Sequence, residues 1–287
     1  MDSTIKARRG LAIFFTVLIA GSAYFERKFL VLGGAIANHL GLIYALLWWV
    51  TVSSIVARLV LRESPRDISF LWGDWRATRA IMVATALPLV AWSTGLARFS
   101  GLKLPQTVFG VSFVGSPATR FLKFLLVMLT LGGLYSCESA AGEEIGWRGY
   151  MLTRLIDSGV PAPIFVSGLV WALWHTPLIL SGQYASGPRP TLSAALFVGD
   201  VIGVGYVFGW LRLSCGSIWP CIWAHGVWNA VIQGPFDMST AGYSNWVDES
   251  GVLTTVTITV FTIVLYRVWP LTQSTLPSKT ARLAHSL

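Results

Sequence analysis

Long stretches without charged side chains are the strongest constraint on the fold of this chain. Residues 158–188 contain no Asp, Glu, Lys or Arg, and neither do residues 29–57. A helix that crosses the hydrocarbon core of a bilayer needs about 20 mostly apolar residues. Soluble domains usually carry about 25% charged residues, whereas this chain carries 12%. These features exclude an ordinary water-soluble enzyme and predict a polytopic membrane protein.

The apolar runs predict an all-α membrane bundle of about eight transmembrane helices, in one membrane domain covering residues 1–287. The predicted spans are 10–25, 38–57, 80–97, 121–141, 161–181, 191–211, 217–233 and 251–269. The first run could instead be a cleaved signal peptide, because small residues at 21–23 suit such a cleavage site; we favour a retained helix. The basic connection at 98–120 is expected to hold an interfacial amphipathic element.

The basic residues are interpreted as topology signals. The net charge is +8, but the Lys and Arg residues lie in short groups between apolar runs, without a nucleic-acid-binding motif. No nucleic-acid partner is therefore expected. With the N-terminus inside, the connecting segments divide the 21 Lys and Arg residues into 14 inside and 7 outside. Cytoplasmic loops carry the excess of Lys and Arg, so we expect a multi-pass protein with both termini cytoplasmic, in the plasma membrane if the source is prokaryotic.

The three cysteines give no sign of a disulfide framework. They include no Cys-x-x-Cys pair and lie in or beside apolar stretches. We expect buried thiols that behave as small apolar residues, and no thiolate zinc site. The residues concerned are Cys137, Cys215 and Cys221.

The polar residues of the predicted spans gather in three clusters. An ionisable group at the centre of a spanning helix costs about 2.5 to 3.5 kcal/mol on insertion scales, so such groups are usually paired and functional. The clusters are Gly-Glu-Glu-Ile-Gly-Trp-Arg-Gly-Tyr at 142–150, Trp-Ala-Leu-Trp-His at 171–175 and His-Gly-Val-Trp-Asn at 225–229. Each alone is most simply structural, but the three together favour a functional site.

The first cluster places two adjacent carboxylates on different helix faces. Residues four apart share a face, so Glu144 and Arg148 are expected to form a salt bridge, with the acid in the favourable N-terminal position. Adjacent residues are rotated by about 100°, so Glu143 can face a cavity. Two carboxylates in different environments can separate an acid/base role from a supporting role.

The other two clusters also place polar groups on one helix face. His225 and Asn229 are four residues apart, so both can donate hydrogen bonds to one position. Trp171 precedes His175 by the same spacing and is expected to line the same cavity. Two further side chains are expected to pack internally or face lipid: Trp174 and Trp228.

The three clusters, in this order, resemble the motifs of the CAAX prenyl protease and bacteriocin-processing (CPBP or Abi) family of intramembrane endopeptidases, in particular its type II CAAX prenyl endopeptidases. The family pattern is Glu-Glu-x-x-x-Arg, then an aromatic residue, often Phe, with three residues between it and a His, then His-x-x-x-Asn. Here the motifs read Glu143-Glu144-Ile-Gly-Trp-Arg148, Trp171-Ala-Leu-Trp-His175 and His225-Gly-Val-Trp-Asn229. The resemblance covers about residues 120–235, and Trp171 in place of Phe is a mild departure that alters the shape of the cavity.

The resemblance implies hydrolysis of a peptide bond within the membrane. In the family, the first Glu and the first His are thought to activate a water molecule, while the second His and the Asn form an oxyanion pocket. The implied partners are membrane lipid and a peptide or protein substrate with a membrane-embedded or lipidated segment, including a prenylated CAAX-type C-terminus. Carried over, the catalytic residues are Glu143, His175, His225 and Asn229, supported by Glu144, Arg148 and Trp171.

The predicted topology also gives the site a position in the membrane. Glu143 falls near the cytoplasmic end of the fourth span, and His225 falls about two turns into the seventh span from the same side. The site is therefore expected to open towards the cytoplasm. His175 comes out deeper, so the fifth helix either starts later than predicted or is tilted.

A metal-dependent mechanism is the main chemical alternative. Histidine and glutamate side chains can bind Zn²⁺ and leave an open position for water. The ligands would be Glu143, His175 and His225. The sequence has no His-Glu-x-x-His spacing, so we favour a glutamate-type mechanism without a cofactor, with a metalloendopeptidase as the alternative.

A non-enzymatic role is the other alternative. The chain could act as a membrane interaction or immunity factor, or as a transporter with a polar path across the membrane. Transporters of this kind usually contain paired broken helices or inverted repeats, and no such repeat is visible in the sequence.

Overall fold

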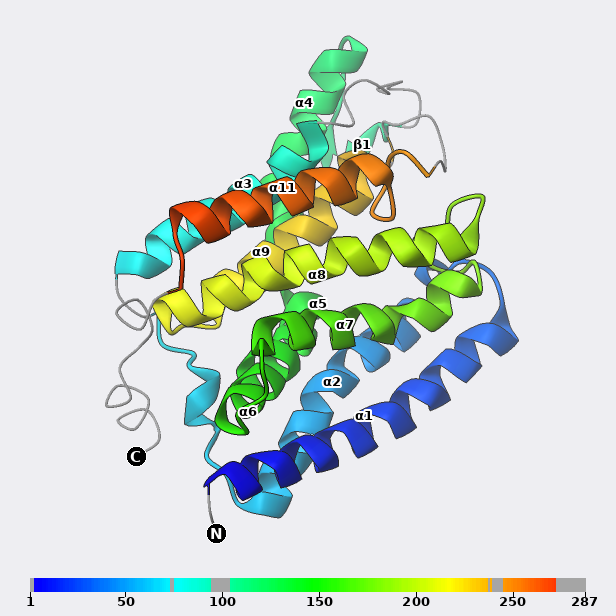
Figure 1. The fold of residues 1–287 in the computed structure, drawn as a ribbon. Coiled ribbons are helices and arrows are strands. Elements are labelled where there is room, and N and C mark those ends of the chain that lie inside the picture. The colour runs from blue at the N-terminus through cyan, green and yellow to red at the C-terminus, as the bar shows by residue number, and fades with distance from the viewer. Residues whose placement is uncertain (1–2, 73–74, 94–103, 237, 239–244, 272–287) are drawn as a thin grey trace.

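The structure is a computed structural model that describes residues 3–72, 75–93, 104–236, 238 and 245–271. Within these residues the chain forms eight continuous helical segments (Figure 1). The helices are α1 (Ser3–Leu32), α2 (Leu40–Leu61), α3 (Trp75–Ser93), α4 (Pro117–Val127), α5 (Gly133–Gly146), α6 (Leu152–Asp157), α7 (Pro163–Leu180), α8 (Pro190–Cys215), α9 (Trp219–Val231) and α11 (Val252–Val268). Helices α4, α5 and α6 form one segment, joined by the π-helical turns η4 (Met128–Gly132) and η5 (Trp147–Met151).

Short elements complete the described chain. The π-helical turn η6 (Ile232–Phe236) extends α9, and the 3₁₀ turns η1 (Ile36–Asn38) and η2 (Pro65–Ile68) lie in connections. Strands β1 (Thr107–Val108) and β2 (Val111–Ser112) form an antiparallel hairpin, with Thr107 opposite Ser112. An amphipathic element was expected at 98–120. In the described part of this connection, residues 107–112 form the hairpin and α4 begins at Pro117. Residues 98–103 lie outside the described residues.

The helical membrane bundle predicted from the sequence is confirmed. In the described residues, five helical segments are long and apolar enough to cross a membrane: Ser3–Leu32, Leu40–Leu61, Pro117–Asp157, Pro163–Leu180 and Pro190–Cys215. Shorter apolar helices lie at Arg79–Leu89 and Val252–Val268. Every predicted span coincides with a helix, and the largest boundary error is at the fourth, which continues to Asp157 instead of ending at 141. The chain is an integral multi-pass membrane protein.

The helices pack so that two ends of the bundle can be distinguished. We call the end where α1 begins and α2 and α8 finish the proximal end, and the end where α1 finishes and α2 and α8 begin the distal end (Figure 1). The closest neighbours are α7 with α8, α5 with α9, and α1 and α5 with α2. At the distal end, the Gln183 side chain donates to the Phe29 carbonyl oxygen at 2.8 Å, which ties the α7–α8 connection to α1.

A buried ion-pair network closes the proximal end. The Arg154 guanidinium contacts Glu63 at 3.0 Å and Asp67 at 2.7 Å, and both of these acids lie in the connection after α2. Arg58 also pairs with Asp67, and Arg212 donates to the Asp67 main-chain oxygen at 2.7 Å. Removing one member of such a buried pair usually leaves an uncompensated charge, so these contacts fix α2, α6 and α8 relative to one another.

Small residues allow the helices around the future site to approach closely. A Cβ atom at Gly226 of α9 would lie 2.9 Å from the Gly133 carbonyl oxygen of α5, and a Cβ at Gly205 of α8 would lie 2.9 Å from the Gly168 Cα of α7. Helices in membranes commonly pack through such small residues, because no side chain separates the backbones. Helices α5 and α9 thus come closest at Gly133 and Gly226, next to the polar clusters.

Replacing Gly226 with alanine is expected to destabilise the protein by about 1 to 3 kcal/mol, the usual range for overpacking a tight contact. The added methyl group meets backbone atoms, which cannot rotate away. The measurement is thermal unfolding of both proteins in the same detergent. Gly41→Ala is the matched control, because a Cβ at this helical glycine meets no atom within 4 Å. Equal melting temperatures for the two variants would show that α5 and α9 are not in tight contact.

Candidate active site

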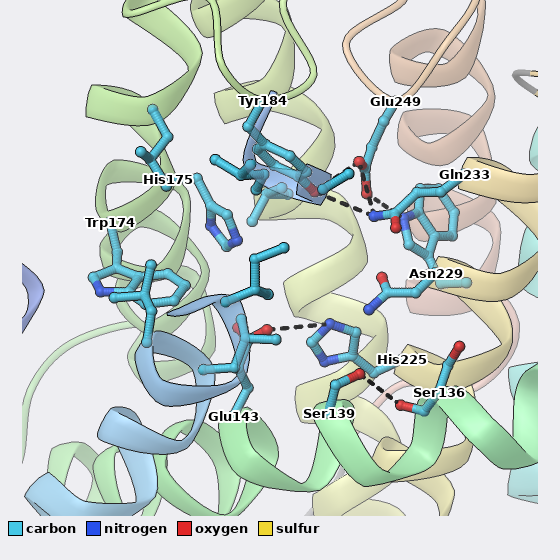
Figure 2. Close-up of a pocket in the computed structure, with 18 of the residues that line it drawn as sticks. Ser136, Ser139, Glu143, Trp174, His175, Tyr184, His225, Asn229, Gln233 and Glu249 are labelled. Atoms are coloured by element: carbon cyan, nitrogen blue, oxygen red, sulfur yellow. Dashed lines mark hydrogen bonds and ion pairs between the residues drawn. The ribbon is translucent and has the colours of Figure 1, made fainter. Parts of the chain in front are cut away.

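The three polar clusters meet at one pocket in the distal half of the bundle. The pocket has a volume of about 290 Å³, close to the lower limit for small-ligand sites. Elements α1 and η1 supply apolar lining residues, whereas α2, α5, α7, α8, α9, η6 and two connections supply the polar groups (Figure 2). The polar lining residues are Tyr44, Tyr135, Ser136, Ser139, Glu143, His175, Tyr184, Asp200, His225, Asn229, Gln233 and Glu249.

Glu143 lies in the pocket with its two carboxylate oxygens in different surroundings. It is 2% exposed. Its Oε2 accepts hydrogen bonds from the indole nitrogens of Trp147, at 3.1 Å, and Trp171, at 2.7 Å. Its Oε1 lies 3.6 Å from Nε2 of His225. Two fixed donors on one oxygen orient the carboxylate and leave the other oxygen towards the pocket.

Glu144 has the supporting geometry expected from its spacing to Arg148. Its Oε1 accepts hydrogen bonds from Arg148 Nη1 at 2.8 Å and from His225 Nδ1 at 2.9 Å. The side chains of Glu144 and Arg148 are both fully buried. The Arg148 guanidinium also stacks on the Trp171 ring, 4.3 Å from its centroid. The predicted Glu144–Arg148 salt bridge is thus present, and it lies behind the pocket wall instead of in the pocket.

The two histidines of the pocket have different hydrogen-bonding states. His175 Nδ1 lies 2.9 Å from the Trp171 main-chain oxygen, which can only accept, so Nδ1 carries a proton and, in the neutral ring, Nε2 carries the lone pair. His225 Nδ1 likewise donates to Glu144, while its Nε2 faces Glu143. His175 is therefore suited to accept a proton, whereas a protonated His225 can donate from Nε2.

Asn229 lies one helical turn beyond His225 on α9, on the same side of the pocket (Figure 2). Its side chain is half-buried and makes no hydrogen bond to any of the described residues, so its amide is available to a bound molecule. All residues predicted for the site are therefore brought together. Glu144 and Arg148 lie behind the pocket wall. The residues that line the pocket are Glu143, Trp171, His175, His225 and Asn229.

A second polar group at the distal side of the pocket was not predicted from the sequence. The Glu249 carboxylate accepts from Tyr184 at 2.7 Å, from Trp228 at 3.1 Å and from Gln233 at 3.3 Å. Figure 2 shows Tyr184, Gln233 and Glu249 above Asn229, facing His225 and Glu143 across the pocket. Trp228, expected to pack internally or face lipid, is thus a pocket residue with a polar partner.

Asp200 was also missed, although a sequence signal was present. It lies on α8, inside the predicted span 191–211, and lines the pocket. The argument that singled out the other polar residues, the cost of an ionisable group within a spanning helix, applies to it equally. Trp174 also lines the pocket, and its indole donates to Ser22 of α1 at 2.7 Å.

The opening of the site towards the cytoplasm stays a prediction, and the structure places the pocket nearer the distal end, where α1 finishes and α2 begins. The pocket is lined by Phe29, Leu40, Leu178 and Tyr184, which lie at the distal end, whereas α1 begins at the proximal end. Glu143 also lies deeper in the bundle than predicted, because the fourth helix is longer than its apolar run. The apolar run ends at the polar motif, but the helix continues to Asp157, so Glu143 lies inside the bundle and not at its end.

The donor atoms do not converge as a metal site requires. Catalytic zinc usually has three protein ligands at about 2.0 to 2.3 Å around one point. Among the described residues, no group of three His, Cys, Asp or Glu side chains is placed to hold an ion. Of the three candidate zinc ligands, His225 contacts a carboxylate at each nitrogen and Glu143 Oε2 accepts two indole hydrogen bonds, whereas Glu143 Oε1 and His175 Nε2 face the pocket without such a donor among the described residues.

The three cysteines are free thiols, with Cys215 and Cys221 buried and Cys137 half-buried, as expected from the sequence. None lines the pocket among the described residues.

Comparison with known families agrees with the motifs. Residues 118–231 match the family described as type II CAAX prenyl endopeptidase Rce1-like. A comparison with curated proteins gave no match. The matched segment runs from the start of α4 to the end of α9 and contains Glu143, His175, His225 and Asn229. The resemblance stated from the motifs is therefore confirmed over residues 118–231, which match the Rce1-like family of type II CAAX prenyl endopeptidases.

Proposed function

We propose that the protein is an intramembrane endopeptidase of glutamate type, which hydrolyses a peptide bond of a membrane-embedded or lipidated substrate in the pocket of Figure 2. The observation that carries the proposal is the environment of Glu143. One oxygen is held by two indole donors, and the other faces the pocket beside His225. This arrangement supports a fixed carboxylate that exchanges protons with a water molecule, the role of a general base.

In the proposed reaction, Glu143 and His175 accept a proton from water while its oxygen attacks the carbonyl carbon of the scissile bond. The lone pair on His175 Nε2 suits this role, because Nδ1 is engaged by the Trp171 carbonyl oxygen. When the tetrahedral intermediate collapses, the C–N bond breaks and the same groups return the proton to the leaving amine. The products are a new carboxylate and a new amine.

His225 and Asn229 are proposed to stabilise the oxyanion of the tetrahedral intermediate. Both lie on one face of α9 and line the pocket. Glu144 holds His225 through Nδ1 and is itself held by Arg148, so the ring orientation is fixed before substrate binds. Donors that are oriented in advance stabilise developing charge without reorganisation during the reaction.

Replacing Asn229 with alanine is expected to lower kcat about 10²-fold to 10³-fold, the range measured when one oxyanion donor is removed. The KM for a peptide substrate should change little, because the charge develops only in the transition state. Steady-state kinetics in detergent give both constants. Asn38→Ala, in the η1 turn outside the pocket, is the control. A change confined to KM would assign Asn229 to substrate binding instead.

The proposed activity can be tested directly on purified protein. Detergent-solubilised protein is incubated in H₂¹⁸O with farnesylated CAAX peptides, their unmodified counterparts and peptides from apolar spans, and the products are identified by mass spectrometry. Hydrolysis places one ¹⁸O atom in the new carboxylate. If the native protein cleaves no peptide of any of these classes, the result would favour a membrane interaction or immunity factor, or a transporter.

Metal dependence is tested on the same preparation. Elemental analysis before and after chelation should show no stoichiometric zinc in active protein. Stoichiometric zinc, with activity lost on its removal and restored on its return, would contradict the glutamate mechanism and support a metalloendopeptidase.

The proposed orientation keeps both termini cytoplasmic, because the predicted topology then divides the Lys and Arg residues into 14 inside and 7 outside. The pocket is at the distal end, so this orientation requires a substrate that enters from the non-cytoplasmic side or from within the membrane. Reporter fusions after Leu61 and within the α7–α8 connection test this choice. A cytoplasmic α7–α8 connection would reverse the orientation and admit cytoplasmic CAAX substrates.

A further inference from the structure

Asp200 is a buried carboxylate without a partner in the lining of the pocket. It is 1% exposed, and neither carboxylate oxygen has a hydrogen-bond partner in the described chain. Burial of a polar group without a compensating hydrogen bond is costly, and an unsatisfied group in a native protein calls for an explanation such as a bound molecule. Its position in the pocket points to a partner that comes from outside the chain.

Glu249 is a second buried acid in the lining of the same pocket. It is 5% exposed, and its carboxylate accepts hydrogen bonds from the neutral side chains of Tyr184, Trp228 and Gln233. Burial, together with the negative charge of Glu249, raises the pKa of Tyr184 well above its usual value, so the phenol keeps its proton and donates it. Glu249 and Asp200 both line this pocket.

Apart from two histidines, His175 and His225, the described lining of the pocket holds no basic side chain to balance its acidic groups. Among the described lining residues there are three carboxylates, from Glu143, Asp200 and Glu249, and no lysine or arginine. Arg148 does not supply the missing charge, since it is fully buried against Trp171 and pairs with Glu144. A substrate carboxylate would meet like charges here, whereas a cation would relieve them.

We propose that Asp200 and Glu249 bind a positively charged side chain of the substrate, lysine or arginine, beside the bond that is hydrolysed. This inference rests on the proposed endopeptidase function and defines its substrate class. Phe197 and Val201, within one turn of Asp200 on α8, also line the pocket and provide an apolar surface for the stem of such a side chain. Lysine and arginine commonly bury their stems in this way while the charged end meets a polar group.

Peptide binding tests this inference independently of hydrolysis. The probes are short fluorescein-labelled apolar peptides that differ only in a central Lys, Met or Glu, and fluorescence anisotropy gives their affinities for detergent-solubilised native protein and for Glu143→Gln. We expect the Lys peptide to bind at least about tenfold more tightly than the Met peptide, a difference of about 1.4 kcal/mol. The Glu peptide should bind more weakly than the Met peptide.

Two conservative variants locate the effect. Asp200→Asn and Glu249→Gln keep the size of each side chain and remove its charge, so each should reduce the preference for Lys to about threefold or less while the Met peptide binds as before. Glu138→Gln is the matched control, since this exposed acid of α5 lies outside the pocket lining. The melting temperature of each variant is measured beside its affinity, and the two acids provide independent tests.

The outcomes separate this inference from the proposed function. A preference for Lys that disappears in both variants, without hydrolysis of any peptide, would support the binding site and contradict the protease. Hydrolysis that depends on Glu143, without a preference for Lys, would support the protease and overturn the inference. An equal preference for Lys in the native protein and both variants would also overturn it.

Discussion

Substitution of Glu143 by glutamine is expected to lower kcat by about 10³-fold or more, near the upper range for loss of a general base. Glutamine has the same size, and its carbonyl oxygen can still accept from the indoles of Trp147 and Trp171, as Glu143 Oε2 does. Its amide cannot take a proton from water. The expected defect is therefore chemical, and the fold and the affinity for peptide should be retained.

The measurement is single-turnover cleavage of a peptide substrate, with binding measured separately. Glu138→Gln makes the same change on the same helix, at an exposed position outside the pocket, and should cleave at the native rate. If Glu143→Gln protein cleaves as fast as the native protein, Glu143 is not the base and the assignment of the site is wrong.

Replacement of His175 by alanine is the second large effect that we expect, a loss of about 10²-fold to 10⁴-fold in kcat. The ring is fixed by its contact with the Trp171 carbonyl oxygen and by packing against Trp174, with ring centroids 4.7 Å apart. Alanine removes Nε2, the atom that shares the proton of the attacking water in the proposed reaction. It also leaves space for a small molecule in the pocket.

Chemical rescue distinguishes loss of this proton acceptor from a change in structure. Added imidazole should restore part of the activity of His175→Ala protein and should not affect the native protein or Glu143→Gln. His39→Ala removes a histidine that does not line the pocket and should leave cleavage unchanged. Activity that survives in His175→Ala without imidazole would remove His175 from the mechanism.

The parts of the site that could be predicted depend on local helix geometry. The spacing of Glu144 and Arg148 fixes their salt bridge within a single helix, and the same rule places His225 and Asn229 on one face. Trp171 was predicted only to line the cavity next to His175. Its indole hydrogen bond to Glu143 joins α7 to α5, and a contact between two helices depends on their relative rotation, which spacing within one helix does not determine.

The parts that could not be predicted depend on how connections and helices pack. Glu249 and Tyr184 lie in two different connections, and they meet only because η6 and the α7–α8 connection both lie at the distal end. The end of the fourth helix was predicted wrongly, because hydropathy ends the fourth span at its polar motif. In the structure the helix continues, since the bundle surrounds Glu143 and Glu144 with Trp147, Trp171 and Arg148.

The central claim, that this chain cleaves peptide bonds in a membrane through Glu143, is tested most directly by comparing membrane proteomes. Cells that produce the native chain and cells that produce Glu143→Ala at the same level are compared for new C-termini by mass spectrometry. The account predicts a set of cleaved membrane or lipidated peptides that appears only with native Glu143, with Lys or Arg enriched beside the cut. Identical peptide sets from the two cell lines would contradict it.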